Sequence, residues 1–135
     1  MRTTILVLAN KTAQSDELFK ALEARAARGE IRLDFVAPPG GAGAAPREAA
    51  QRRLDEALER AREAGWPATG RIGDCDALTA VLDAYDPTRH DEIIVSTLPA
   101  SVSHWIGIDL PARVARRTNA LVSHVQVPER RPAVA

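Results

Sequence analysis

The 135-residue sequence has one cysteine, few aromatic residues and no long apolar run. Its single thiol, Cys75, excludes an intramolecular disulfide framework and suits the reducing environment of the cytoplasm. The apolar run from Ile5 to Ala9 is too short for the core of a signal peptide or for a membrane span. We therefore expect a cytoplasmic protein that has no membrane partner.

An excess of positive charge is also missing, because 18 basic residues balance 18 acidic ones. Nucleic-acid binding depends on clustered cations, so this balance predicts no nucleic-acid partner. The chain is instead rich in alanine, and 45% of its residues are hydrophobic. A chain of this size can bury enough apolar surface to fold without a disulfide or a metal, and we expect no metal site.

Short β-branched runs alternate with helical stretches along the chain. The expected strands are residues 4–8, 31–36, 68–72, 93–95 and 121–127. The first expected helix begins after Ser15 and ends at Gly29, and the second extends from Pro46 to Ala64. The third opens near Asp74, which would cap it, and stops before Pro87, and the fourth extends from Asp109 to about Thr118.

The runs Ile5-Leu6-Val7-Leu8 and Ile93-Ile94-Val95 are continuously apolar, as in parallel sheets that helices cover on both faces. Each strand except the last is followed by a helix long enough for a right-handed crossover. The sequence therefore predicts an α/β fold, a doubly wound, five-stranded parallel sheet in a Rossmann-like three-layer sandwich. We expect one domain over residues 1–128 and a flexible tail over residues 129–135.

Three segments resemble the universal stress protein family, and the likeness extends from Thr4 to Val127. They are Ile72-Gly73-Asp74 through Tyr85, Asp91–Thr97, and Leu110-Pro111-Ala112-Arg113-Val114. The resemblance implies the strand order 3-2-1-4-5. It also implies dimerisation through the fifth strand, as in many members, and ATP binding, as in one subgroup.

The ATP-binding members carry a glycine motif after the fourth strand, and this chain departs from it. Between Ser96 and Asp109 the single glycine, Gly107, does not fall at a motif position. Pro99 has no N–H to offer a phosphate, and a carboxylate at Asp109 would repel one from the start of the fourth helix. Asn10 stands where the family usually has an acidic residue. The chain therefore resembles the subgroup that lacks the ATP-binding glycine motif.

Ligands of open parallel sheets bind beyond the carboxyl ends of the strands, where the winding reverses. With the implied order, that crevice lies between the first and fourth strands. The candidate ligand contacts are Asn10, Lys11, Thr12, Val36, Ala37, Ser96 and Thr97. The amide of Asn10 can read a base edge, and the lysine and hydroxyl groups can meet anionic or hydroxyl groups of a ligand. The alternative is that Asn10 and Thr12 are turn residues and Ser96 is a small residue at a strand end.

The fifth strand would lie at an edge of the sheet, where an unpaired apolar strand invites association. Pairing with a two-fold copy of itself would cover it, and this makes a second copy of the chain the expected partner. The candidate interface residues are Leu121, Ser123, His124, Val125 and Val127. At that seam the charge of His124 would tune association with pH. The alternative is a solvent-facing histidine on an edge that is covered in another way.

No catalytic constellation is recognised in the sequence. The glycines at residues 40–43 lack dinucleotide spacing, and the neighbours Ser103 and His104 have side chains that point apart. Cys75 has neither a paired base nor a histidine at metal-ligand spacing, so we expect a small packed residue there. Trp105 either fills the space that nucleotide occupies in ATP-binding relatives or belongs to a patch for a partner protein.

These observations favour a non-catalytic stress-response or regulatory protein that is homodimeric, needs no cofactor and does not bind ATP in the family's usual way. A sensor that binds ATP or AMP between the first and fourth strands is the alternative. An enzyme that acts on a small metabolite in the same crevice is the third hypothesis.

Overall fold

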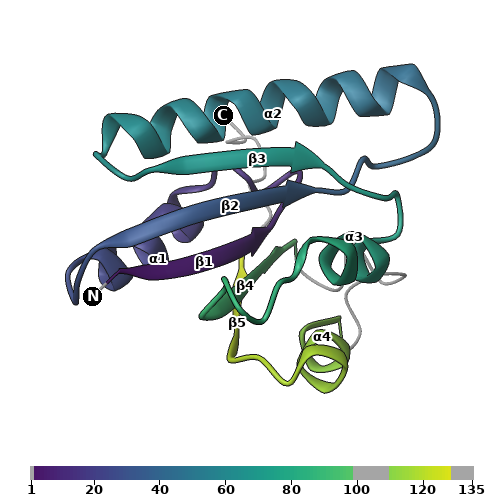
Figure 1. Cartoon of the computed structure of the whole chain (residues 1–135). Helices are drawn as coiled ribbons and strands as arrows, with labels where there is room; N and C mark the ends of the chain where they lie inside the picture. The colour runs from purple at the N-terminus through teal and green to yellow at the C-terminus, as the bar shows by residue number, and fades with distance from the viewer. Residues whose placement is uncertain (1, 99–109, 129–135) are drawn as a thin grey trace.

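Five parallel strands form one sheet in the order β3-β2-β1-β4-β5, with helices on both faces (Figure 1). The computed structural model describes residues 2–98 and 110–128. Its elements are β1 (Thr3–Leu8), α1 (Asp16–Ala26), β2 (Ile31–Ala37), α2 (Ala44–Glu63), β3 (Ala68–Ile72), α3 (Ala77–Ala84), β4 (Glu92–Thr97), α4 (Leu110–Thr118) and β5 (Val122–Gln126). The predicted fold class and the strand order implied by the resemblance are both confirmed.

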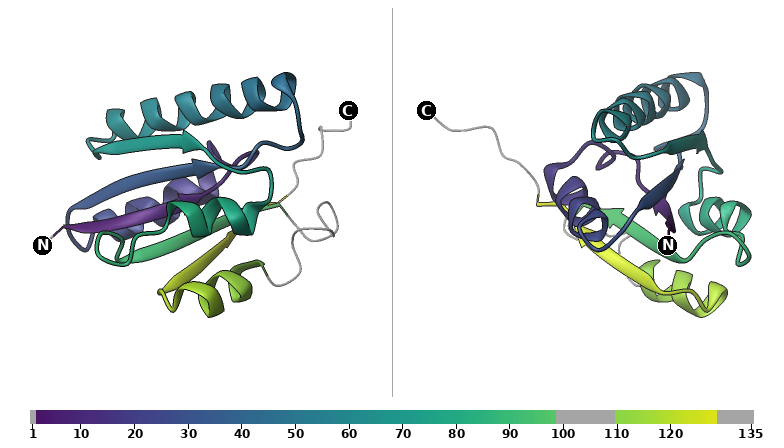
Figure 2. Two further views of the ribbon diagram at one scale, coloured as in Figure 1. Left: turned by 45° about the vertical axis from the view of Figure 1, so that its right-hand side comes forward. Right: turned by 60° about the vertical axis from the view of Figure 1, so that its left-hand side comes forward.

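The sheet separates two apolar cores, and β1 contributes to both. Ile5 and Val7 point into the core under α1 and α2, whereas Leu6 and Leu8 point into the core with α3 and α4. Figure 2 shows these two helix pairs on opposite sides of the sheet. A central strand covered on both faces must be apolar at successive positions, which explains the continuous apolar run.

The start of α3 differs from the prediction. Asp76, not Asp74, is the N-cap, and its carboxylate accepts a hydrogen bond from the N–H of Thr79 at 3.0 Å. Asp74 instead accepts from the N–H of Asp76 at 2.8 Å, in an Asx turn one step earlier. The expected packing of Cys75 is also wrong, because its side chain is exposed. Aspartate is a favourable N-cap residue at position 74 and at position 76, so the sequence alone does not show which of the two caps α3.

Other helix and strand ends differ from the predicted ones by a few residues. Helix α2 begins at Ala44, so that Pro46 lies inside its first turn, where the missing N–H costs nothing. Strand β4 is longer than predicted at both ends, and β5 is shorter. The predicted start of α4 at Asp109 and the tail over residues 129–135 lie outside the described residues. Within the part described, no helix has the length and apolarity that crossing a membrane requires.

Candidate functional site

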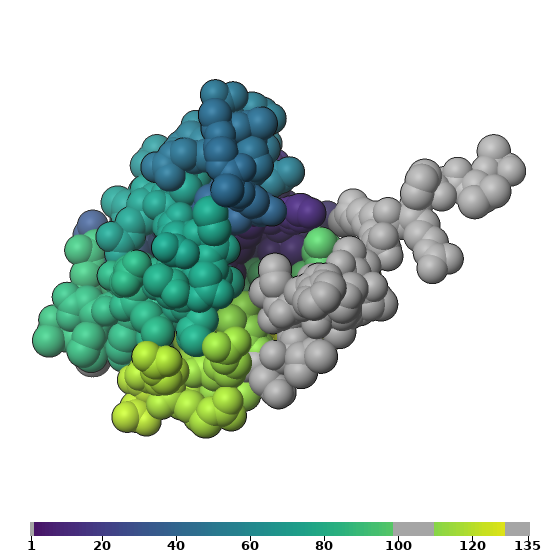
Figure 3. Space-filling view, turned by 90° about the vertical axis from the view of Figure 1, so that its right-hand side faces the viewer, coloured from purple at the N-terminus to yellow at the C-terminus, as the bar shows by residue number. Residues whose placement is uncertain are grey.

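A crevice of about 200 Å³ lies beyond the carboxyl ends of β1 and β4. The crossovers leave β1 and β4 in opposite directions, so the two strand ends are not covered by a common helix. Figure 3 looks onto this end of the sheet. The described lining residues are Leu8, Ala9, Asn10, Lys11, Thr12, Pro38, Pro39, Gly40, Cys75, Ala77, Ser96, Thr97, Leu98 and Leu110. Five of the seven residues that the sequence analysis selected for ligand contact are among them.

The hydroxyl groups of Thr12 and Ser96 bind each other across the crevice. Ser96 Oγ donates to Thr12 Oγ1 at 2.7 Å, and Thr12 Oγ1 donates to the carbonyl oxygen of Ser96 at 3.2 Å. Both residues are buried. The pair closes the gap between the ends of β1 and β4, and it occupies both hydroxyl protons before any ligand arrives.

Asn10 is held by an arginine that the sequence analysis did not select. Arg53, on α2, donates from Nη1 to Asn10 Oδ1 at 3.1 Å. With its oxygen engaged in this way, the Asn10 amide is left with its NH2 group beside Gly40. Arg53 is off the apolar stripe of α2, and helical periodicity alone marks it only as a surface residue. Its partner is 43 positions away, and no local pattern links the two.

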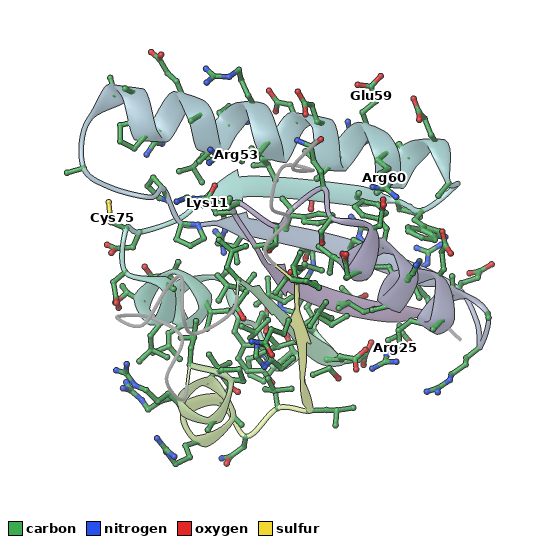
Figure 4. The ribbon with its side chains drawn as sticks, turned by 180° about the vertical axis from the view of Figure 1, so that it is seen from behind. Lys11, Arg25, Arg53, Glu59, Arg60 and Cys75 are labelled. Carbon is green, nitrogen blue, oxygen red and sulfur yellow. The ribbon has the colours of Figure 1, made fainter. Side chains whose placement is uncertain are left out.

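Lys11 is exposed at the crevice, and it forms no ion pair with any residue in the ranges 2–98 and 110–128. Figure 4 shows Lys11, in the loop after β1, and Arg53, on α2, at the same end of the sheet as Cys75. The described lining contains no carboxylate, so Lys11 is the one charged group among those lining residues. The wall formed by the end of β1 is therefore positive.

Val36 and Ala37 are placed differently from the other five residues selected for ligand contact. They are buried in β2 and do not line the crevice. The carbonyl oxygen of Val36 accepts from the N–H of Ala9, and that of Ala37 accepts from the N–H of Gly73. Thr97 does line the crevice, but its hydroxyl lies 2.6 Å from Nε2 of His124 on β5.

The fifth strand lies at the sheet edge, as the resemblance implied. Leu121 is 67% exposed and His124 is exposed, whereas Ser123 and Val125 are partly buried and Val127 is buried. Although the residue as a whole is exposed, partial desolvation of its imidazole lowers the pKa of His124, so its neutral form is favoured at neutral pH. The strand keeps apolar surface at an edge that the described residues leave unpaired.

Several residues that the sequence analysis considered are not among those that the structure describes. Pro99, Trp105, Gly107 and Asp109, on which the arguments about phosphate and nucleotide space depended, lie outside the described residues. Among residues 2–98 and 110–128, no group of three His, Cys, Asp or Glu side chains is placed to hold a metal ion.

Two universal stress proteins are among the solved structures that are similar to this chain. A protein from the universal stress protein family of Burkholderia pseudomallei matches with a TM-score of 0.59 at 22% sequence identity, over 94% of this chain and 96% of that chain. The universal stress protein from Archaeoglobus fulgidus gives a TM-score of 0.60 at 18% identity, over 91% of this chain and 93% of that chain. No protein-family model and no curated protein sequence matches the chain. At these identities, the likeness shows the fold.

Proposed function

We propose that this chain, whose fold is that of the universal stress proteins, is a non-catalytic regulatory protein of the stress-response type. Its crevice would not bind ATP in the way that the family's glycine-motif members do. The observation that carries this proposal is the mutual hydrogen bonding of Thr12 and Ser96. A hydroxyl whose proton is already donated to a buried partner can reach a phosphate only if that bond breaks.

The sequence supports the same conclusion. The stretch from Ser96 to Asp109 lacks the glycines that allow a backbone to approach a triphosphate closely. A sensor of ATP or AMP remains the second candidate, because five predicted contact residues line one crevice.

We expect purified protein to show no saturable binding of ATP at micromolar concentrations, with or without magnesium. Isothermal titration calorimetry measures this directly. A second readout is the alkylation rate of Cys75, the chain's single thiol, which is exposed and lines the crevice. Micromolar ATP affinity, with matching protection of Cys75, would instead establish the nucleotide sensor. Turnover of a metabolite that disappears in a Ser96→Ala/Thr97→Ala variant would establish the enzyme hypothesis.

We also propose that the protein is a homodimer joined through β5. The hydrogen bonds from Ile93 N to Leu121 O and from Val127 N to Thr97 O set which backbone groups of β5 face β4. By alternation, the N–H and carbonyl groups of Val122, His124 and Gln126 face outward from the sheet edge. These groups can pair with a second copy of the strand.

A His124→Pro variant should be monomeric in sedimentation velocity at concentrations where the parent protein is a dimer. Proline removes the outward N–H of residue 124 and leaves the ladder to β4 intact. His124→Ala is the matched control, since it also loses the side-chain contact with Thr97 but keeps the N–H. A parent protein that is monomeric at high micromolar concentration would refute the homodimer.

A further inference from the structure

The charged groups around the crevice differ between its two sides. On the β1 side stand the ammonium group of Lys11 and the guanidinium group of Arg53, which reaches Asn10. On the α3 side, Asp74 and Asp76 are not lining residues, but their exposed carboxylates flank Cys75, which is one. Hydrogen bonds from the hydroxyl and the N–H of Thr79 lower the pKa of Asp76, so it is charged at neutral pH. An anionic group entering the crevice is therefore drawn towards β1 and away from α3.

The β1 wall also presents donors at fixed positions. Arg53 holds the oxygen of Asn10, which leaves the amide NH2 group beside Gly40, another lining residue. Lys11 adds an ammonium group without an ion-pair partner in the described parts of the chain. Donors of this kind suit the oxygens of a phosphate group, which accept several charge-assisted hydrogen bonds at once.

We propose that the crevice binds a small phosphate monoester, with its phosphate group against Lys11, Asn10 and Arg53 at the end of β1. This inference rests on the proposed function, in that it names the class of ligand that the regulatory crevice accepts. The volume of about 200 Å³ favours a compact organic phosphate, because pockets for drug-sized ligands begin at about 300 Å³. The phosphate lies on the α2 side of the sheet end, so the hydroxyl pair of Thr12 and Ser96 stays intact.

The test uses ribose 5-phosphate, with ribose as its neutral match and inorganic phosphate as the isolated group. For each protein variant, the alkylation rate of Cys75 with iodoacetamide is measured with and without the compound. The ratio of the two rates removes any direct effect of a substitution on the thiol. Ribose 5-phosphate should protect Cys75 at a concentration at least about tenfold lower than ribose does, the effect of one charge-assisted contact.

The most informative variant is Asn10→Asp, which changes one atom type at the crevice wall and removes no cation. A carboxylate there would stand about 3 Å from Arg53 Nη1, as the amide oxygen does now, and would neutralise the guanidinium group. We expect it to weaken ribose 5-phosphate binding about tenfold or more. Lys11→Met and Arg53→Met should do the same. Lys20→Met and Arg52→Met, exposed cations on α1 and α2, should leave it unchanged.

Equal protection by ribose and ribose 5-phosphate would overturn the proposal, and so would unaltered binding in all three crevice variants. Absence of protection at millimolar ribose 5-phosphate would overturn it as well. Circular dichroism establishes that each variant is folded, and Asn10→Asp preserves the shape of the side chain it replaces. The proposed function fails separately. Micromolar ATP binding by the parent protein would refute the proposed function. If Asn10→Asp also weakened that ATP binding, the proposed position of the phosphate group would still be supported.

Discussion

Replacing Arg25 by methionine should lower the free energy of unfolding by about 3 kcal/mol, the largest stability effect that we predict. Arg25, on α1, donates from Nε and Nη2 to the carboxylate of Glu92 at 2.9–3.2 Å. The Glu92 side chain is only 5% exposed, whereas that of Arg25 is 26% exposed. The arginine can be lost to methionine without leaving a large void, but the carboxylate would remain buried without its cation.

The substitution should also weaken the attachment of the edge strand. Ser123, on β5, accepts from Arg25 Nη2 at 3.1 Å and donates to Glu92 Oε2 at 3.3 Å. These bonds connect α1, β4 and β5 near the amino end of the sheet. Removing the guanidinium group therefore leaves a buried charge without its cation and takes one of the two hydrogen-bond partners from a partly buried hydroxyl.

A double substitution separates the cost of an unpaired charge from the value of the ion pair. In Arg25→Met/Glu92→Met no buried charge remains, so most of the lost stability should return, to within about 1 kcal/mol of the parent protein. Arg28→Met, which removes an exposed cation near the same helix end, should change stability by less than about 0.5 kcal/mol. Urea unfolding measures all three variants. A double variant no more stable than Arg25→Met would contradict this account.

Glu92 illustrates what the sequence left undecided. The run Ile93-Ile94-Val95 predicts the strand correctly, but the predicted strand begins at residue 93 and leaves Glu92 outside it. In the structure Glu92 belongs to β4 and is buried, because an arginine 67 positions earlier reaches it from α1. Apolar periodicity reports which face of an element is covered, whereas the pairing of two polar groups depends on the tertiary arrangement.

In the crevice, too, the sequence predicts where residues lie but not which polar groups pair. Its position followed from the strand order. Five of its lining residues follow too, because Ser96 and Thr97 end β4 and Asn10, Lys11 and Thr12 come just after β1. The contacts within it could not be predicted. The hydroxyl pair joins residues 84 positions apart, and the arginine that holds Asn10 comes from the middle of α2. Val36 and Ala37 end a strand beside β1, but their side chains are enclosed by the core.

Asp34 is the second polar group whose removal should cost much stability. It lies on β2, and its carboxylate accepts from Thr69 Oγ1 at 2.6 Å and from Arg89 Nη2 at 3.3 Å. It also lies 2.8 Å from Nε2 of the buried His90. The N–H of Asp86 donates to Nδ1 of that ring, so Nε2 carries the hydrogen that Asp34 accepts. One carboxylate thus joins β2, β3 and the segment that leads into β4.

We expect Asp34→Asn to lower the free energy of unfolding by about 2 kcal/mol at pH 7. An asparagine keeps the size of the side chain but presents an NH2 group to donors, so either His90 or Arg89 loses its acceptor. Asp83→Asn is the matched control, since Asp83 is an exposed acid on α3. Its effect should stay below about 0.5 kcal/mol.

The pH dependence of this difference tests the cause. Burial by itself would raise the pKa of Asp34, but the hydrogen bonds from Thr69 and His90 and the charge of Arg89 lower it overall. A carboxyl whose pKa is lowered by folding stabilises the protein fully above its unfolded pKa, about 3.9, and loses that contribution as the pH falls through the folded value. The stability gap between the parent protein and Asp34→Asn should therefore be present at pH 7 and shrink below about pH 4. Urea unfolding at both pH values measures it. If this difference in free energy of unfolding instead grew on acidification, the charged carboxylate would destabilise the folded protein. The network of Thr69, Arg89 and His90 would then not stabilise its charge.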